Sequence, residues 1–218
     1  MSDENVSGTE RLNRKETTVR LIPLLVLSLL FLISGIILFH SQFTVISVIT
    51  VIVEAVVAGF GEELIFRLIL LGLCFKFLKE SKHVPAVIVV SVLFGLAHFA
   101  NLRGGSFEFS MVLFQVVAAG VAGLMFGFIF YNSRSYWLCA GVHFLYDLGV
   151  FTISIGVGNL TLAGVGDLIS ELLIIALCGL IIASLVKTSA KFLRIEMILG
   201  LILAVTITVL KFIAYSAL

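Results

Sequence analysis

The sequence predicts an all-α, polytopic membrane helix bundle with about seven transmembrane helices. Of the 218 residues, 61% are hydrophobic and only 12% are charged, whereas soluble domains are about 25% charged. Seven apolar stretches of roughly membrane-spanning length follow one another along the chain. Basic residues gather in every second connector between them, which is the pattern of a multi-pass protein.

The first three stretches are separated by short polar connectors. The first ends at the polar break His40-Ser41-Gln42. The second is longer than one untilted span requires at 1.5 Å per residue, so we expect it to tilt, to bend near Gly59 and Gly61, or to project into the cytoplasm. The third begins at Pro85, which suits a first helical turn. The expected spans are Leu21–Phe39, Phe43–Phe75 and Ala86–Ala100, the last followed by a polar loop, Asn101–Ser106.

The remaining four stretches complete the bundle. Gly120, Gly123 and Gly127 in the fourth allow close contact with another helix. Tyr136 and Trp137 open the fifth as an interfacial anchor, and a glycine-containing outer loop, residues 156–166, separates it from the sixth. The expected spans are Phe109–Tyr131, Tyr136–Ile155, Leu168–Val186 and Ile195–Ala214.

Loop charges predict the orientation and the domain limits. Arg103 and Lys211 lie on one side, and the other basic residues of the spans' connectors lie on the opposite side. The positive-inside rule then places the N-terminus in the cytoplasm and the C-terminus outside. We expect residues 1–19 to form a polar cytoplasmic tail, disordered or lying on the surface, and residues 20–218 to form a single membrane domain.

The three cysteines, Cys74, Cys139 and Cys178, are expected to be small apolar side chains that fill space between helices.

Three charged residues interrupt the second apolar stretch: Glu62, Glu63 and Arg67. Charge at membrane depth is costly and marks function by default. In a helix Glu63 and Arg67 share one face, and breaking such a pair would leave an uncompensated charge. Glu62 is rotated about 100° from Glu63. Glu63 is therefore expected to pair with Arg67, which leaves Glu62 available for another role. Glu54, two turns earlier, has no assigned partner.

Other ionisable groups lie in the third and fifth spans. His98 stands alone in its apolar helix, and His143 and Asp147 lie four apart on one helix face. Each feature taken singly favours a structural role. Together they place groups capable of proton chemistry on three helices of one small bundle. A desolvated carboxylate is a general base, one histidine can hold the same water, and a second can donate to a developing oxyanion. That set is the minimum equipment for amide hydrolysis, and neither a serine or cysteine nucleophile with a base partner nor a His-Glu-x-x-His pattern is evident.

These residues resemble a known family, the CAAX proteases and bacteriocin-processing enzymes (CPBP, also called Abi), which are related to the type II CAAX prenyl endopeptidase. Glu62-Glu63-Leu-Ile-Phe-Arg67 matches its Glu-Glu-x-x-x-Arg motif, Phe94-Gly-Leu-Ala-His98 its Phe-x-x-x-His motif, and His143-Phe-Leu-Tyr-Asp147 its His-x-x-x-Asn/Asp motif. The motif core spans residues 43–155. The resemblance implies that Glu62 and His98 activate water, that His143 and residue 147 form the oxyanion hole, and that Glu63 and Arg67 brace the site.

One position departs from the prenyl endopeptidase, which has Asn where this chain has Asp147. An ionised carboxylate cannot donate a hydrogen bond. Asp147 is therefore protonated, or orients His143 from behind, or binds a metal. No cofactor is expected, and the alternative is a zinc ion held by Glu62, His98, His143 and Asp147, whose nitrogen and oxygen donors zinc accepts.

The sequence thus predicts an intramembrane endopeptidase of a bacterial plasma membrane, an assignment to bacteria suggested by the short tail and compact size. Its expected partners are a peptide or small membrane protein as substrate and the lipid bilayer, with no nucleic acid. One alternative is a non-catalytic membrane protein for bacteriocin self-immunity or surface display. Another is a proton-coupled carrier, because intramembrane Glu and His residues also serve as proton relays, although no repeat supports it.

Overall fold

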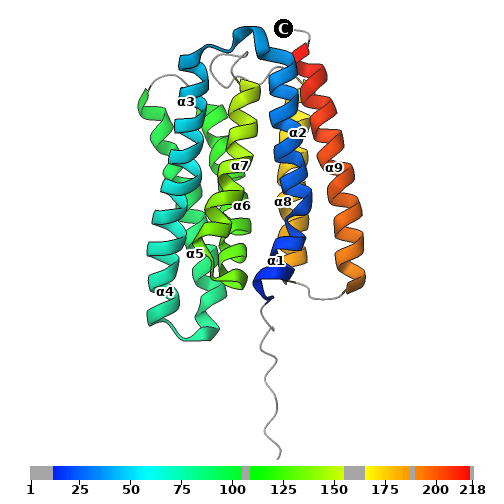
Figure 1. Cartoon of the computed structure of the whole chain (residues 1–218). Coiled ribbons are helices and arrows are strands. Elements are labelled where there is room, and N and C mark those ends of the chain that lie inside the picture. The colour runs from blue at the N-terminus through cyan, green and yellow to red at the C-terminus, as the bar shows by residue number, and fades with distance from the viewer. Residues whose placement is uncertain (1–11, 105–108, 155–164, 187–189, 217–218) are drawn as a thin grey trace, which may run out of the picture.

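The computed structural model describes residues 12–104, 109–154, 165–186 and 190–216, and all elements within these ranges are helices. Successive long helices run alternately up and down in one bundle (Figure 1). The α-helices are α1 Arg14–Arg20, α2 Ile22–Phe39, α3 Val45–Val56, α4 Gly72–Phe77, α5 His83–Ala97, α6 Phe109–Ser133, α7 Tyr136–Ser154, α8 Val165–Val186 and α9 Ala190–Ser216. The 3₁₀ and π-helical segments are η1 His40–Gln42, η2 Val57–Glu62, η3 Leu64–Leu71, η4 Glu80–Lys82 and η5 His98–Gly104.

Seven helices in the described residues are long and apolar enough to cross a membrane, which confirms the predicted fold class. They match the expected spans in order, with shifts of a few residues at their ends. The expected polar loop after the third span is helical as far as Gly104, because η5 continues directly from α5. Its last residues, 105–106, and most of the expected outer loop at 156–166 lie outside the described residues.

The second span is one continuous helix of 33 residues, Val45–Phe77. Its centre is π-helical in η2 and η3, with i→i+5 backbone hydrogen bonds, so the helix widens where Gly59 and Gly61 predicted a bend. Wide turns of this kind often occur at functional sites. Gly59 also allows close packing, because a Cβ atom built there would lie 2.5 Å from the backbone nitrogen of Phe144 on α7.

The residues just before the first span form a short helix, α1, that lies against the bundle. Asn13 caps α1 and forms a reciprocal capping box with Glu16. Leu12 is buried, and its backbone N–H donates to Asn132 Oδ1 of α6 at 3.1 Å. Of the two expected alternatives, disordered or lying on the surface, residues 12–19 are not disordered, because a capping box and an apolar residue dock this segment onto the bundle.

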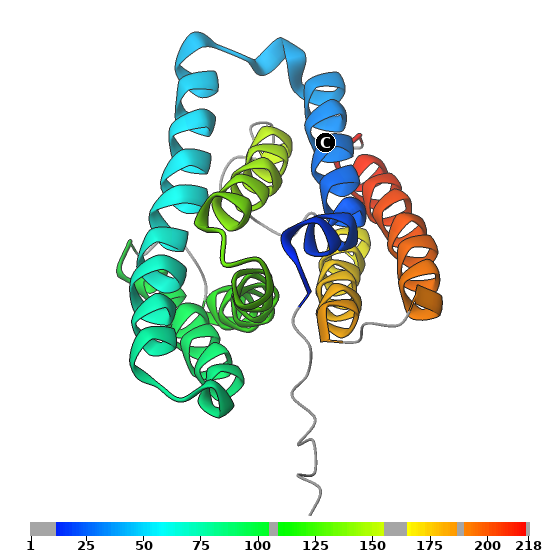
Figure 2. The ribbon, with the colours of Figure 1, turned by 60° about the horizontal axis from the view of Figure 1, so that its bottom comes forward.

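Helix α7 occupies the middle of the bundle. Figure 2 shows it between the long helix α3–α4 on one side and α2 with α8 and α9 on the other. Its contacts with α2 are close: a Cβ at Gly149 would lie 2.7 Å from the carbonyl oxygen of Ser28. All three glycines expected to allow close contact on α6 lie against α5. A Cβ at Gly123 or Gly127 would lie under 3 Å from α5 side chains, and a Cβ at Gly95 of α5 would lie 3.0 Å from the Gly120 backbone, whereas a Cβ at Gly120 itself would meet nothing within 4 Å.

Packing differs between the two ends of the bundle. On α6 every residue from Met125 to Ser133 is buried, whereas Val112 alone is buried between residues 109 and 122. The fully buried side chains Leu21, Leu27 and Ile129 all lie toward the end where α2 begins and α6 ends. Along α6 the opposite half is therefore less buried, although Phe39, Ile153 and Ile207 of other helices are buried there. The polar residues of interest lie at the boundary between the halves.

Candidate active site

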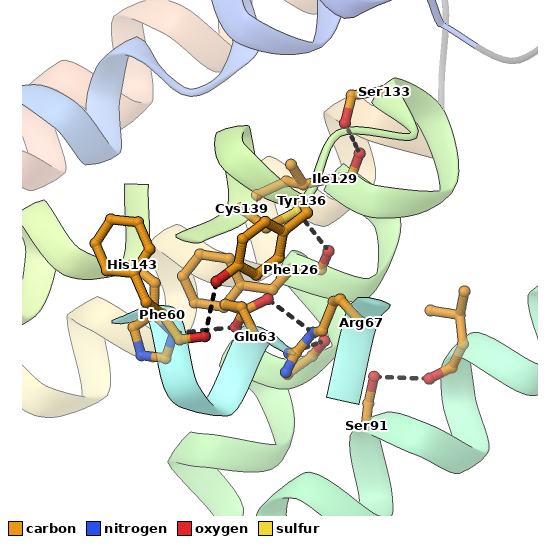
Figure 3. Close-up of polar contacts among 12 residues, drawn as sticks. Phe60, Glu63, Arg67, Ser91, Phe126, Ile129, Ser133, Tyr136, Cys139 and His143 are labelled. Carbon is orange, nitrogen blue, oxygen red and sulfur yellow. Dashed lines mark hydrogen bonds and ion pairs between the residues drawn. The ribbon is translucent and has the colours of Figure 1, made fainter. Parts of the chain in front are cut away.

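A buried ionic network joins α7 to the second span (Figure 3). Glu63 is 0% exposed, and its Oε2 lies 3.2 Å from Arg67 Nε. Its Oε1 lies 3.0 Å from His143 Nδ1. The contact between Glu63 and Arg67 occurs as the four-residue spacing predicted, even though the helix is widened there. The contact between Glu63 and His143 was not predicted, because it depends on how two distant segments pack.

Arg67 fixes this network to two further helices. Its Nη2 donates to the carbonyl oxygen of Gly123 on α6 at 3.0 Å. Its guanidinium carbon lies 4.6 Å from the ring centre of Phe94 on α5, a distance that permits a cation–π interaction. The guanidinium is thus almost fully desolvated yet surrounded by a carboxylate, a carbonyl and an aromatic face. Such a pair is costly to break, because removing one partner leaves the other charge buried.

His143 is held on both ring nitrogens. Nδ1 faces Glu63, and Nε2 lies 3.3 Å from Asp147 Oδ2. Its ring stacks on Phe126, with centroids 4.6 Å apart and planes 21° apart. A carboxylate only accepts hydrogen bonds, so both contacts require a proton between ring and carboxylate on each side. Asp147 therefore contacts the ring nitrogen opposite the one that Glu63 contacts, and it is the more exposed of the two carboxylates. The alternatives for its chemical role stay predictions.

A cavity of about 520 Å³ lies beside this network. The four residues predicted to be catalytic, which come from three different spans, all line it: Glu62, His98, His143 and Asp147. Glu63 and Arg67 do not line it but lie behind its wall. The carboxyl group of Glu62 interacts electrostatically with both histidines. The structure therefore brings the predicted residues to one hollow within the membrane-spanning part of the bundle, while their chemical roles stay predictions.

His98 has a defined orientation in this cavity. Its Nδ1 lies 3.0 Å from the backbone carbonyl oxygen of Phe94, one helical turn earlier. A carbonyl oxygen only accepts, so the neutral ring carries its proton on Nδ1. Nε2 then keeps a lone pair, with which it can accept a hydrogen bond from a water molecule. This arrangement suits a residue that holds water beside a carboxylate base.

Three polar residues of the cavity wall were not among the predicted site residues. Asn101 Nδ2 donates to Gln115 Oε1 at 2.8 Å, which joins η5 to α6. Glu171 of α8 also lines the cavity and binds Lys211 of α9. The sequence signal for Gln115 and Glu171 was their isolation in apolar spans.

Two further acids in the spans lie elsewhere. Glu54, which had no assigned partner, is exposed on the outer side of α3 and does not line the cavity. Glu196 of α9 is 0% exposed and was missed, although it is the only acid in the seventh apolar stretch. It lies near Arg20 and Ser184, where Arg20 Nη1 donates to the Ser184 carbonyl oxygen at 2.7 Å. This second ionic cluster lies apart from the cavity.

The donor atoms fit the zinc alternative poorly. Within the part of the chain that the structure describes, His, Cys, Asp and Glu side chains do not gather in a group of three able to hold a metal ion. Both ring nitrogens of His143 already face carboxylate oxygens, so neither offers a free lone pair to a metal. Zinc binding by Glu62, His98, His143 and Asp147 would require this arrangement to change.

Comparisons with known proteins support the motif-based resemblance. Residues 44–149 match the family model described as type II CAAX prenyl endopeptidase Rce1-like. A search of curated proteins and a search of solved structures gave no match. The matched segment contains all three motifs and runs from the start of α3 into α7. The predicted resemblance is confirmed over residues 44–149, where the chain matches the family model of the Rce1-like type II CAAX prenyl endopeptidases.

Proposed function

We propose that this multi-pass membrane protein is an intramembrane endopeptidase that hydrolyses a peptide bond in a membrane-associated peptide or small protein. The family supports a CAAX-type intramembrane protease. The observation that carries the finer proposal is the shared cavity, where Glu62 and His98 meet His143 and Asp147. Its volume admits a segment of peptide together with a water molecule.

Water activation is assigned to Glu62 and His98. Glu62 accepts a proton from a water molecule that also donates to Nε2 of His98, and the resulting hydroxide attacks the carbonyl carbon of the scissile bond. The carbon–nitrogen bond then breaks, and the proton on Glu62 passes to the leaving amine. Glu63 is unsuited to this role, because it is fully buried and bound to Arg67 and His143.

Stabilisation of the oxyanion is assigned to His143. Glu63 accepts from Nδ1–H and so directs Nε2–H toward Asp147 and the cavity. The Asp147 oxygen marks the position that an acceptor of this hydrogen bond occupies. In the proposed reaction the substrate carbonyl oxygen takes that place, and the charge that develops on it is stabilised by Nε2–H. Asp147 would hold His143 ready when no substrate is bound.

Cleavage of an internally quenched peptide library by the purified protein in phospholipid vesicles tests this proposal. We expect wild-type turnover to be lost in Glu62→Ala and His98→Ala while both variants keep the wild-type unfolding temperature. Treatment with phenanthroline should leave turnover unchanged, and metal analysis should find no stoichiometric zinc. Unchanged turnover in both variants would refute the catalytic assignment. Loss of turnover on chelation would favour the zinc alternative, and an immunity assay in which Glu62→Gln still protects would favour the non-catalytic one.

A further inference from the structure

Basic residues mark one end of the bundle. Arg14, Arg20, Lys79 and Arg134 lie at the end where α2, α5 and α7 begin, the lower end in Figure 1. At the other end of the described spans the basic residues are Arg103 and Lys211, and Lys211 binds Glu171. By the positive-inside rule, the basic end faces the cytoplasm.

The cavity lies away from that end. On α6 its polar wall residue is Gln115, in the loosely packed half, and its deepest residues are Met125 and Phe126, where full burial begins. On α5 and η5 it is lined by the last helical residues, including His98 and Asn101. On α8, whose direction is opposite, its wall begins with Glu171 in the first third of the helix.

The basic half of the bundle closes the cavity from below. Leu24, near the start of α2, forms part of the floor and is 2% exposed. Beneath the cavity lie the fully buried Leu21, Ile129 and Cys139, which leave no room for a peptide at native packing density. On α5, η5 and α6 the wall at the other end consists of small and polar residues: Ala97, Ala100, Asn101, Gln115, Ala118 and Ala119. Their short side chains leave space, and the amides can exchange hydrogen bonds with a peptide backbone. On α7 the wall also includes Val150 and Phe151.

We propose that the cavity opens toward the side of the membrane opposite the basic connectors, so that its substrate is a polypeptide segment presented from outside the cytoplasm. The nature of the ligand rests on the proposed function, whereas the direction of access rests on the charges and the packing alone. A substrate on this side is an exported peptide or the outer part of a membrane protein, and a segment in the cytoplasm does not reach Glu62 and His98.

Cysteine accessibility tests the direction of access without using catalysis. The background replaces Cys74 and Cys178 by alanine and keeps Cys139, which is 0% exposed. Single cysteines are then introduced as Arg103→Cys, Lys79→Cys and Ala118→Cys. Intact cells are treated with a membrane-impermeant maleimide before and after permeabilisation. Ile129→Cys is the matched control, because Ile129 lies on the same helix as Ala118 but is fully buried. Its labelling would show that the maleimide also reaches the buried half of α6.

We expect Arg103→Cys and Ala118→Cys to be labelled in intact cells, and Lys79→Cys to be labelled at least tenfold more after permeabilisation. Ile129→Cys should stay unlabelled until the protein is denatured. Labelling of Lys79→Cys but not Arg103→Cys in intact cells would reverse the orientation and overturn the proposal. Labelling of Ala118→Cys from the Lys79 side only, or from neither side in a protein that elutes as folded, would equally overturn it.

Oriented vesicles link the access route to the substrate. A charged, membrane-impermeant peptide from the cleaved library members is added to vesicles of each orientation, sorted by whether Arg103→Cys or Lys79→Cys is exposed. We expect at least tenfold faster cleavage where Arg103→Cys faces the bulk solution, and faster cleavage from the Lys79 side would contradict the proposal. If labelling is as expected but neither orientation cleaves any library peptide, the proposed function fails while the direction of access stands.

Discussion

Along α6, the half of the bundle beside the basic connectors differs in burial from the half that contains the cavity, although both are helical and apolar. The first buries nearly every side chain of α6, and the second leaves alanines and amides around a cavity of about 520 Å³. The boundary between the halves holds Arg67, Glu63 and His143. Their hydrogen bonds fix the orientation of the residues that line the cavity. Stability and chemistry are therefore expected to respond to different residues, and each prediction below tests this separation.

The largest expected loss of stability follows removal of Arg67. Arg67→Met should lower the free energy of unfolding by about 3–5 kcal/mol, because Glu63 is left charged and buried without its partner. An SDS titration of the detergent-solubilised protein measures this change. The double variant Glu63→Gln/Arg67→Met should regain much of the loss, since it removes both charges and keeps an oxygen that accepts from His143. A double variant no more stable than Arg67→Met would contradict the ionic explanation.

A matched pair on α6 compares the two halves directly. Ile129→Ala should lower the free energy of unfolding by about 2–5 kcal/mol, because it opens a cavity in the packed half, and should leave the turnover of folded protein unchanged. Ala118→Phe places a large ring in the cavity, which Ala118 lines. It should cost little stability and block most turnover. If Ile129→Ala and Ala118→Phe lowered the free energy of unfolding and the turnover in the same way, stability and catalysis would not depend on different halves of the bundle.

Two glycines of the second span test how closely it must approach α7. Gly59→Ala should cost about 1–3 kcal/mol, since the added carbon would lie 2.5 Å from the Phe144 nitrogen and force the helices apart. Gly61→Ala meets nothing within 4 Å and is the control. Thermal unfolding and turnover should both fall in the first variant alone. Equal behaviour of the two would show that close contact at Gly59 is unimportant.

The smallest expected effect concerns Asp147. Asp147→Asn keeps an oxygen that accepts from Nε2–H of His143, and it removes a negative charge beside the proposed oxyanion. Turnover should therefore change by less than about tenfold, a difference of 1.4 kcal/mol in the barrier, and it should rise rather than fall. Steady-state kinetics with one library peptide measures this change. A loss of a hundredfold or more would mean that the carboxylate itself takes part in the reaction.

Much of the fold could be predicted from the sequence because membrane spans depend on local hydropathy, and the pairing of Glu63 with Arg67 depends on spacing within one helix. The contact of Glu63 with His143 could not, since it needs the packing of the widened centre of the second span against α7. The ordered residues 12–19 carried a signal in the capping box of Asn13 and Glu16. Glu196 carried another as an isolated acid in an apolar span. Asn101 and Gln115 gave only a weak signal, because uncharged amides in or beside a span are common.

The central claim is tested most directly by two carboxylates of the same helix. Glu62 lines the cavity, and Glu54 is exposed on its outer side. We expect Glu62→Gln to lower kcat for a cleaved library peptide by about 10²–10⁴-fold, as loss of a general base does, and Glu54→Gln to keep wild-type kcat in the same vesicles. Equal kcat for wild type, Glu62→Gln and Glu54→Gln would contradict the account.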